Sequence, residues 1–193
     1  VLLVTSAVPS EGKSTVAANL ARTMAFAGSR VLLIDADLRR GKLHEFFGTH
    51  REPGLAELLR HQGQVKDFII RDALPNLFVI PCGEPISDSG ELFLSAGFDQ
   101  LLKEVHQDFD HILIDSAPVF AADDATTLAP KMDGVLFVLR GSYTRARLAR
   151  QAIELLYQRQ AKVLGLIFNR ANAHSGSYYY YKYADYYHSP RRA

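Results

Sequence analysis

The chain has 193 residues, of which 48% are hydrophobic and 22% are charged, and its formal net charge is +1. This length and composition predict one globular domain with a substantial core. The near-zero net charge gives no case for nucleic acid as a partner. The single cysteine, Cys82, excludes an intramolecular disulfide and is typical of a reducing, cytoplasmic compartment. No apolar run approaches the roughly 18 residues that a membrane span needs.

A candidate phosphate loop follows the first expected strand, residues 1–5. The loop, residues 7–15, reads AVPSEGKST, and a helix is expected from Ser14 to about Ala27. Backbone amides of such a loop and the positive end of its helix bind phosphate groups. Lys13 would reach the β- and γ-phosphates, and the Ser14 hydroxyl would ligate Mg²⁺. The alternative is a strand–turn–helix unit that contains Gly-Lys-Ser without binding phosphate. We predict a nucleoside triphosphate site formed by Pro9, Ser10, Glu11, Gly12, Lys13, Ser14 and Thr15.

The rest of the chain alternates between short apolar runs and amphipathic segments. Further strands are expected at residues 30–35, 77–81, 111–115, 134–139 and 163–169, and further helices at 54–61, 97–106, 123–131 and 144–160. Apolar strands separated by helices predict a mostly parallel sheet flanked by helices on both faces. With the phosphate loop, this indicates the α/β fold of a P-loop NTPase over residues 1–170. The periodicity then stops, so residues 171–193 are predicted to form a flexible tail.

Two of the expected strands lead into aspartates. Asp35 and Asp37 follow the run VLLI, and Asp115 follows the run ILI. Ligands of open parallel sheets lie beyond the carboxyl ends of the strands, so these carboxylates should converge on the phosphate loop and its metal ion. A helix cap or a turn is the alternative for a single aspartate. Asn169 ends the last strand, where its amide could pair with the edge of a base or could form a turn.

The tail holds seven of the nine tyrosines of the chain. A run of adjacent phenols is a poor core element. Each phosphate added to it would bring about −1.5 to −2 charges, which would repel an acidic docking site. Adhesion to a partner through the aromatic rings is the alternative, whereas Tyr143 and Tyr157 are expected to be structural. The predicted phosphate acceptors are Tyr178, Tyr179, Tyr180, Tyr181, Tyr183, Tyr186 and Tyr187.

Together these motifs resemble one family, the bacterial tyrosine autokinases (BY-kinases) that regulate exopolysaccharide polymerisation and export. The resemblance rests on the loop at residues 7–15, the stretch DADLRR at 35–40, the strand that ends at Asp115, and the tyrosine cluster. It implies a kinase that transfers phosphate from ATP to tyrosines of its own tail. The implied catalytic residues are Lys13, Asp35 as the base, Asp37 and Asp115, and the implied Mg²⁺ ligands are Ser14, Asp37 and Asp115.

The resemblance also implies partners and a location. Members form homo-oligomeric rings, act with a membrane activator segment or protein, and are opposed by a phosphotyrosine phosphatase. We therefore expect a cytoplasmic protein tethered to the inner face of the plasma membrane. The ring motif and activator would precede Val1, and a chain that starts there without a methionine is expected to be a fragment. The alternative is a positioning or partitioning ATPase that acts as a nucleotide-switched binding module, although Val8 stands where those proteins carry a signature lysine.

Overall fold

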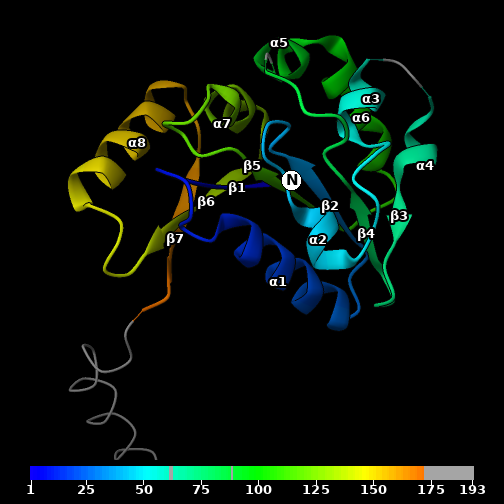
Figure 1. Ribbon diagram of the computed structural model, residues 1–193, viewed down its shortest axis with the longest axis horizontal. Helices are drawn as coiled ribbons and strands as arrows, with labels where there is room; N and C mark the ends of the chain where they lie inside the picture. Colours follow the sequence, from blue (N-terminus) through cyan, green and yellow to red (C-terminus); the bar gives the residue numbers. More distant parts are fainter. Residues whose placement is uncertain (61–62, 88, 172–193) are drawn as a thin grey trace, which may run out of the picture.

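The fold is described by a computed structural model that covers residues 1–60, 63–87 and 89–171. Helices and strands alternate along the chain (Figure 1). In chain order they are β1 (Leu2–Ser6), α1 (Lys13–Phe26), β2 (Val31–Ala36), α2 (Leu43–Phe47), α3 (Leu55–Leu59), α4 (Val65–Phe68), β3 (Ile70–Arg71), β4 (Leu77–Ile80), α5 (Ser89–Leu94), α6 (Ala96–Val105), β5 (His111–Ser116), α7 (Asp124–Leu128), the 3₁₀ helix η1 (Ala129–Lys131), β6 (Gly134–Arg140), α8 (Ala146–Gln158) and β7 (Val163–Asn169).

The strands form one seven-stranded sheet in the order β3-β4-β2-β5-β1-β6-β7. All neighbouring pairs are parallel except β3 with β4. The register aligns Asp115 of β5 with Val4 of β1 on one side and with Asp35 of β2 on the other. The carboxyl ends of β1, β2 and β5 therefore meet at one edge of the sheet, which is where open parallel sheets bind ligands.

Helices cover both faces of the sheet. α1 and α2 lie on one face, and α5, α6, α7 and α8 lie on the other (Figure 1). The side chains of β2 alternate accordingly: Leu32 and Ile34 join the core beneath the second group of helices, whereas Val31 and Leu33 join the core beneath α1. Burial on both faces explains why the central strands read as continuous apolar runs rather than alternating ones.

The sequence predicted six of the seven strands to within one residue at each end. The elements it missed, α2, α4, α5 and β3, contain two to six residues each, too few to show a periodicity. The helix expected at 123–131 is α7 followed by η1, because Pro130 has no amide hydrogen to continue an α-helix. The seven tail tyrosines lie outside the described residues, and the division at residue 170 stays a prediction.

Within the described ranges, no helix combines the length and the apolar character that crossing a membrane would require.

Candidate active site

Two residues with positive φ shape the phosphate loop. Ser10 has a φ of 67° and Gly12 has a φ of 93°, a conformation that glycine adopts without steric cost. A Cβ atom at Gly12 would also meet the amide nitrogen of Asn169, so the Asn169 side chain would have to move. α1 begins at the next residue, and no described side chain caps its N-terminus. Its first amides are therefore left for phosphate oxygens.

The ends of β6 and β7 brace this loop. The Glu11 side chain is buried, and its carboxylate accepts one backbone N–H at 2.8 Å and the hydroxyl of Thr144. Asn169 donates from Nδ2 to the carbonyl of Glu11 at 3.0 Å, and Arg140 donates to the carbonyl of Ser10 at 3.0 Å. The side chains of Glu11 and Asn169 thus hold the loop in shape. Pairing of Asn169 with a base stays a prediction.

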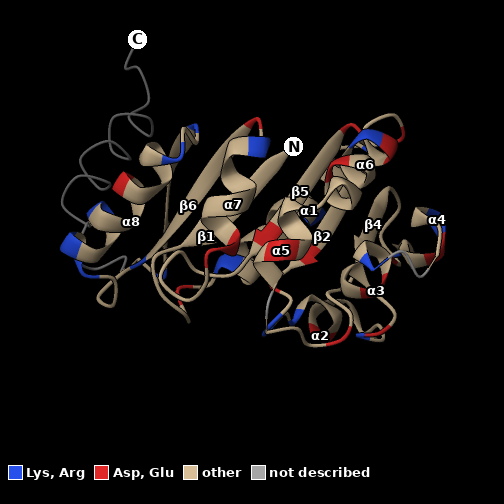
Figure 2. Cartoon of the chain, turned by 90° about the horizontal axis from the view of Figure 1, so that it is seen from above, with Lys and Arg blue, Asp and Glu red and all other residues tan. Residues whose placement is uncertain are grey.

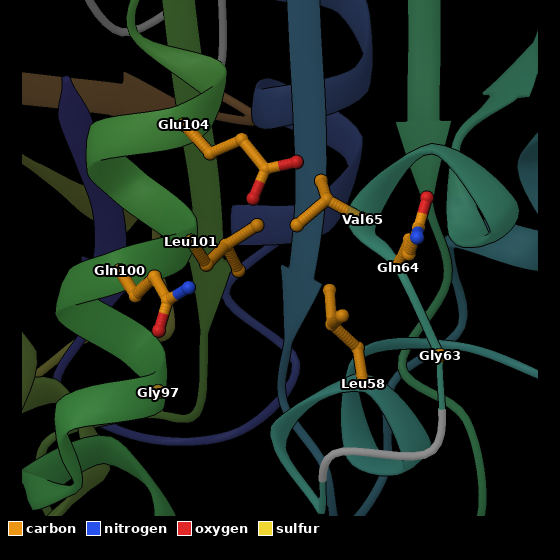
Figure 3. A pocket seen from close by; sticks show the side chains of 8 residues that line it. All are labelled: Leu58, Gly63, Gln64, Val65, Gly97, Gln100, Leu101 and Glu104. Atoms are coloured by element: carbon orange, nitrogen blue, oxygen red, sulfur yellow. The ribbon is translucent and has the colours of Figure 1, made fainter.

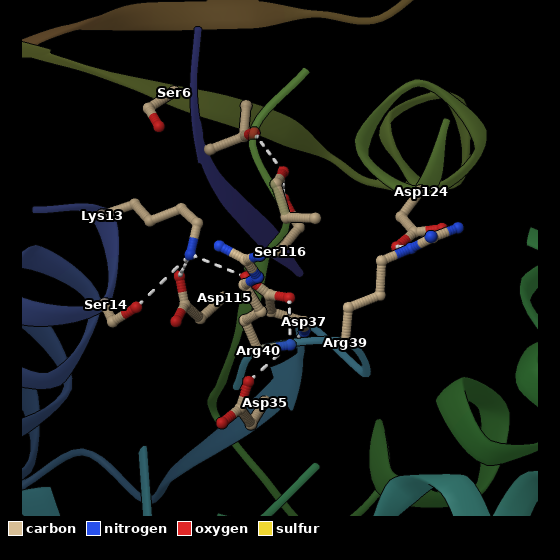
Figure 4. A network of polar contacts seen from close by, with 12 residues as sticks. Ser6, Lys13, Ser14, Asp35, Asp37, Arg39, Arg40, Asp115, Ser116 and Asp124 are labelled. Carbon is tan, nitrogen blue, oxygen red and sulfur yellow. Dashed lines mark hydrogen bonds and ion pairs between the residues drawn. The ribbon is translucent and has the colours of Figure 1, made fainter. Parts of the chain in front are cut away.

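Lys13 lies between two carboxylates at the centre of the site (Figure 4). Its Nζ is 3.1 Å from Asp37 Oδ2 and 3.9 Å from Asp115 Oδ1, and it donates to the Ser14 hydroxyl at 3.5 Å. Burial lowers the pKa of Lys13, but Asp115 and Asp37 outweigh it, so the pKa lies above its usual 10.5. Lys13 is therefore a fixed positive charge shared by two acids.

Asp115 forms an ion pair with Lys13, but the capacity of its oxygens to accept hydrogen bonds is not used by the described residues. It is fully buried at the end of β5, and neither oxygen accepts a hydrogen bond from the residues that the structure describes. Burial raises the pKa of Asp115, with Lys13 and Ser14 opposing it. Mg²⁺ takes oxygen ligands and is commonly held by one or two carboxylates together with water and substrate phosphates. Asp115, Asp37 and the Ser14 hydroxyl therefore fit the predicted magnesium site.

Asp35 has both of its carboxylate oxygens hydrogen-bonded to backbone amides. Its Oδ2 accepts the Leu43 N–H at 2.9 Å and its Oδ1 accepts the Asp37 N–H at 3.3 Å. Burial and the neighbouring Asp115 raise the pKa of Asp35 to about 8, and the Leu43 N–H opposes them. Gly41 passes so close that a Cβ atom there would lie 2.5 Å from Oδ1. The role of Asp35 as catalytic base stays a prediction.

The phosphate loop, Lys13, Ser14 and Asp37 open onto one cleft of about 1220 Å³. Ligand pockets commonly hold about 300–1,000 Å³, so this cleft has room for a nucleotide and part of a second substrate. A smaller hollow of about 300 Å³ lies between α3, α4 and α6 (Figure 3). Glu104 is the one ionisable side chain among its lining residues. The large cleft, which is lined by Lys13, Ser14 and Asp37, is therefore the candidate active site.

Sequence reasoning missed several side chains of the cleft. Arg39, Arg140 and Arg170 line it, and Arg140 and Arg170 stand at the ends of β6 and β7, where the rule that identified the aspartates would also have found them. Asp124 is buried beside Arg39, 4.0 Å from its Nε, and accepts the Ser89 hydroxyl at 2.7 Å. Burial raises the pKa of Asp124. No motif marks this residue, because the contact joins segments far apart in sequence.

Known proteins share both the sequence and the fold of this chain. Residues 10–160 match a family model described as an AAA domain. The chain is 32% identical over 179 residues to the tyrosine-protein kinase CpsD of Streptococcus agalactiae, which covers 92% of this chain and 78% of that protein. It is 33% identical over 199 residues to the succinoglycan biosynthesis transport protein ExoP of Rhizobium meliloti, which covers 97% of this chain and 25% of ExoP. It spans about a quarter of the length of the first curated relatives that it matches.

Solved structures of bacterial proteins also share the fold of this chain. The kinase domain of the Escherichia coli tyrosine kinase ETK superposes with a TM-score of 0.83 at 29% identity, over 89% of this chain and 69% of that one. The cell division protein MinD of Aquifex aeolicus has a TM-score of 0.76 at 22% identity, covering 92% of this chain and 72% of that one, and so shares the fold alone. The phosphate loop, the converging aspartates and the match to most of CpsD identify the chain as a member of the bacterial tyrosine kinase family.

Proposed function

We propose that this chain transfers the γ-phosphoryl group of ATP to tyrosine hydroxyls of its own C-terminal cluster, residues 178–187. The observation that carries this proposal is Lys13, held between Asp37 and Asp115 at the mouth of the phosphate loop. Phosphoryl transfer depends mainly on positioning and on neutralising charge. The names of the relatives, tyrosine-protein kinase and succinoglycan biosynthesis transport protein, support the same reaction and a role in exopolysaccharide production.

Different residues in and around the cleft would bind the phosphates, hold the metal ion and accept the proton. Amides of the loop and of the first turn of α1 bind the phosphate oxygens, and Lys13 leaves Asp37 to contact the β- and γ-phosphates. Mg²⁺, when bound by Ser14, Asp37 and Asp115, would neutralise charge on those oxygens. The phenol oxygen forms a bond to the γ-phosphorus, the bond between that phosphorus and the oxygen that bridges it to the β-phosphorus breaks, and ADP leaves. Asp35, in its ionised form, would receive the phenol proton.

The experiment is incubation of the full-length protein with labelled ATP and Mg²⁺, followed by phosphotyrosine detection. Lys13→Met should abolish labelling, and changing the seven tail tyrosines to phenylalanine should remove it while ATP binding remains. Lys66→Met is the matched control, because Lys66 is exposed on α4, outside the cleft. Unchanged labelling in Lys13→Met would remove the phosphate loop from the mechanism.

We also propose how the whole protein assembles, which partners it has and where it is located. A homo-oligomeric ring, a membrane activator, an opposing phosphatase and tethering of a cytoplasmic domain to the inner face of the plasma membrane all rest on the family resemblance. The competing function, a positioning ATPase, gains no support from Val8, which is partly buried and packs against the core rather than presenting a charge to the cleft.

A further inference from the structure

The order of the strands divides the large cleft into two sides. The phosphate loop follows β1, at the middle of the ligand edge. β5 and β2, with Asp115, Asp35 and then Asp37, lie on one side of it, whereas β6 and β7, which lead to Arg140 and Arg170, lie on the other. Asp115 and Asp37, which would hold the metal ion that neutralises the transferred phosphate, both lie on the β5–β2 side, so we expect the γ-phosphate to face that side. The nucleoside then extends to the β6–β7 side, and the acceptor must enter from the β2 side.

The entrance on the β2 side is basic. Arg40 and Lys42 lie on the loop that follows Asp37, and both line the cleft with exposed side chains. Lys42 is 64% exposed and contacts Glu45 at 3.3 Å, whereas within the described ranges no side-chain partner contacts the Arg40 guanidinium. Figure 2 shows basic segments beside α2, outside the acidic residues near the ends of β2 and β5. An incoming chain therefore meets the exposed Arg40 guanidinium and the Lys42 ammonium, whose pairing with Glu45 is exposed to solvent.

This entrance is tied to the catalytic groups and also offers an aromatic surface. The backbone N–H of Arg40 donates to Asp37 Oδ1 at 2.9 Å, which fixes the basic loop relative to the predicted metal ligand. Phe46 of α2 lines the same wall and is 37% exposed. Arg39, the third cation, is already directed to Asp124 (Figure 4). Arg40 is thus left for a ligand, Lys42 could exchange its exposed pairing with Glu45 for one, and Phe46 offers a ring on which a phenol can pack.

We propose that Arg40, Lys42 and Phe46 form an acceptor subsite that prefers tyrosines with negatively charged neighbours, phosphotyrosine above all. This inference rests on the proposed function. In the segment YYYYKYADYY, residues 178–187, most tyrosines are adjacent to another tyrosine or near Asp185. Each transfer to one tyrosine would place a phosphate beside the next acceptor, and that phosphate would contact Arg40 and Lys42. Phosphorylation of the cluster would then favour its own continuation until the segment leaves the site.

The proposed subsite predicts that a flanking phosphate strengthens binding of the acceptor, whereas repulsion by the aspartates alone would weaken it. Asp35 and Asp115 are fully buried and Asp37 nearly so, and Lys13 and the bound cation neutralise part of their charge. The exposed guanidinium and ammonium groups lie at the entrance, where a flanking phosphate would be placed. Exposed ion pairs each change an equilibrium about two- to threefold, so two of them predict a preference of about fivefold. The preference should shrink at high salt because salt screens exposed charges.

The test measures binding of two fluorescent peptides with the sequence of residues 178–187, one unmodified and one phosphorylated on its second tyrosine. The full chain is loaded with ADP and Mg²⁺, which cannot donate a phosphoryl group, so the result does not depend on transfer. We expect the phosphopeptide to bind about fivefold more tightly at low salt. Equal affinity, or weaker binding of the phosphopeptide, would overturn the subsite and favour repulsion.

Variants locate the preference. The double variant Arg40→Gln, Lys42→Gln should lose it, whereas Lys66→Gln, Lys103→Gln, which removes two exposed cations on α4 and α6, should keep it. A double variant that still prefers the phosphopeptide would overturn the assignment. If the double variant does not fold, as judged by ADP binding, the single variant Lys42→Gln should still reduce the preference about twofold. A chain that shows the preference but transfers no phosphate would overturn the proposed kinase function alone.

Discussion

Asp35→Asn is expected to stabilise the nucleotide-free chain at neutral pH, although it removes a predicted catalytic residue. Asp35 is fully buried, and its pKa is raised from 3.8 to about 8, mainly by burial and then by Asp115. Between these two pH values the folded state holds a proton that the unfolded state releases. The stability of the wild type therefore falls as pH rises through this window. Asparagine does not titrate and avoids that loss.

The size of the effect follows from two opposing contributions. At pH 7 the raised pKa destabilises the wild type by about 4 kcal/mol, since 7 lies 3.2 above 3.8 and each pKa unit is worth about 1.4 kcal/mol. Asparagine at this position would give back about 1–3 kcal/mol of that gain in stability. The N–H groups of Leu43 and Asp37 both donate to the Asp35 side chain, and the single oxygen of an asparagine can accept only one of them. The net gain is about 2 kcal/mol, or about 4–8 °C in Tm for a chain of this size.

The assay is thermal unfolding of both proteins from pH 4 to pH 9, with a chelator present to exclude metal ions. The advantage of Asp35→Asn should grow with pH, because at pH 5 the cost to the wild type is only about 2 kcal/mol, and it should level off above pH 8. Asp108→Asn, at an exposed carboxylate before β5, is the control. A Tm difference that stays constant across the series would refute the reasoning.

Two further substitutions probe the surroundings of the site. Gly41→Ala should displace Asp35, because the new Cβ would lie 2.5 Å from Oδ1. The disturbed carboxylate hydrogen bonds should lower the free energy of unfolding by about 1–3 kcal/mol, as measured by denaturant titration. Gly165→Ala, whose new Cβ would meet no atom within 4 Å, is the control. Thr144→Val should weaken ATP binding in calorimetry, because the hydroxyl joins Glu11 to the Arg140 N–H. Affinity equal to that of Thr23→Val, at an exposed helical threonine, would contradict the bracing role.

The parts of this fold that the sequence predicts well are those governed by local pattern. Strands such as β5 are apolar on both faces, and the loop before α1 carries its own spacing, so both can be identified without knowledge of their neighbours. The rule that ligands lie beyond the carboxyl ends of parallel strands then places Asp35 and Asp115 at the phosphate loop, and the register confirms that they are aligned.

What the sequence could not predict depends on contacts between distant segments. Glu11 stands in the loop motif as one more nucleotide-binding position, yet its side chain is buried against Thr144, 133 residues away. The three aspartates look equivalent in sequence, but only Asp35 has both oxygens held by backbone amides, and only Asp115 has two oxygens without a hydrogen bond from the described residues. Such differences arise from the conformation of the loop after β2, which cannot be predicted from the pattern of apolar residues.

The burial of these acids connects the stability of the chain to its ligand. Lys13 balances one charge among Asp35, Asp37 and Asp115, and burial raises the pKa of two of these acids in the free chain. Their proximity therefore costs folding free energy that better-packed apolar residues would not cost. A bound Mg²⁺ would supply positive charge among these acids, and a metal–nucleotide pair that binds only the folded site should restore stability with the logarithm of its concentration. The arrangement that weakens the free domain is thus the same one that makes metal and nucleotide binding favourable.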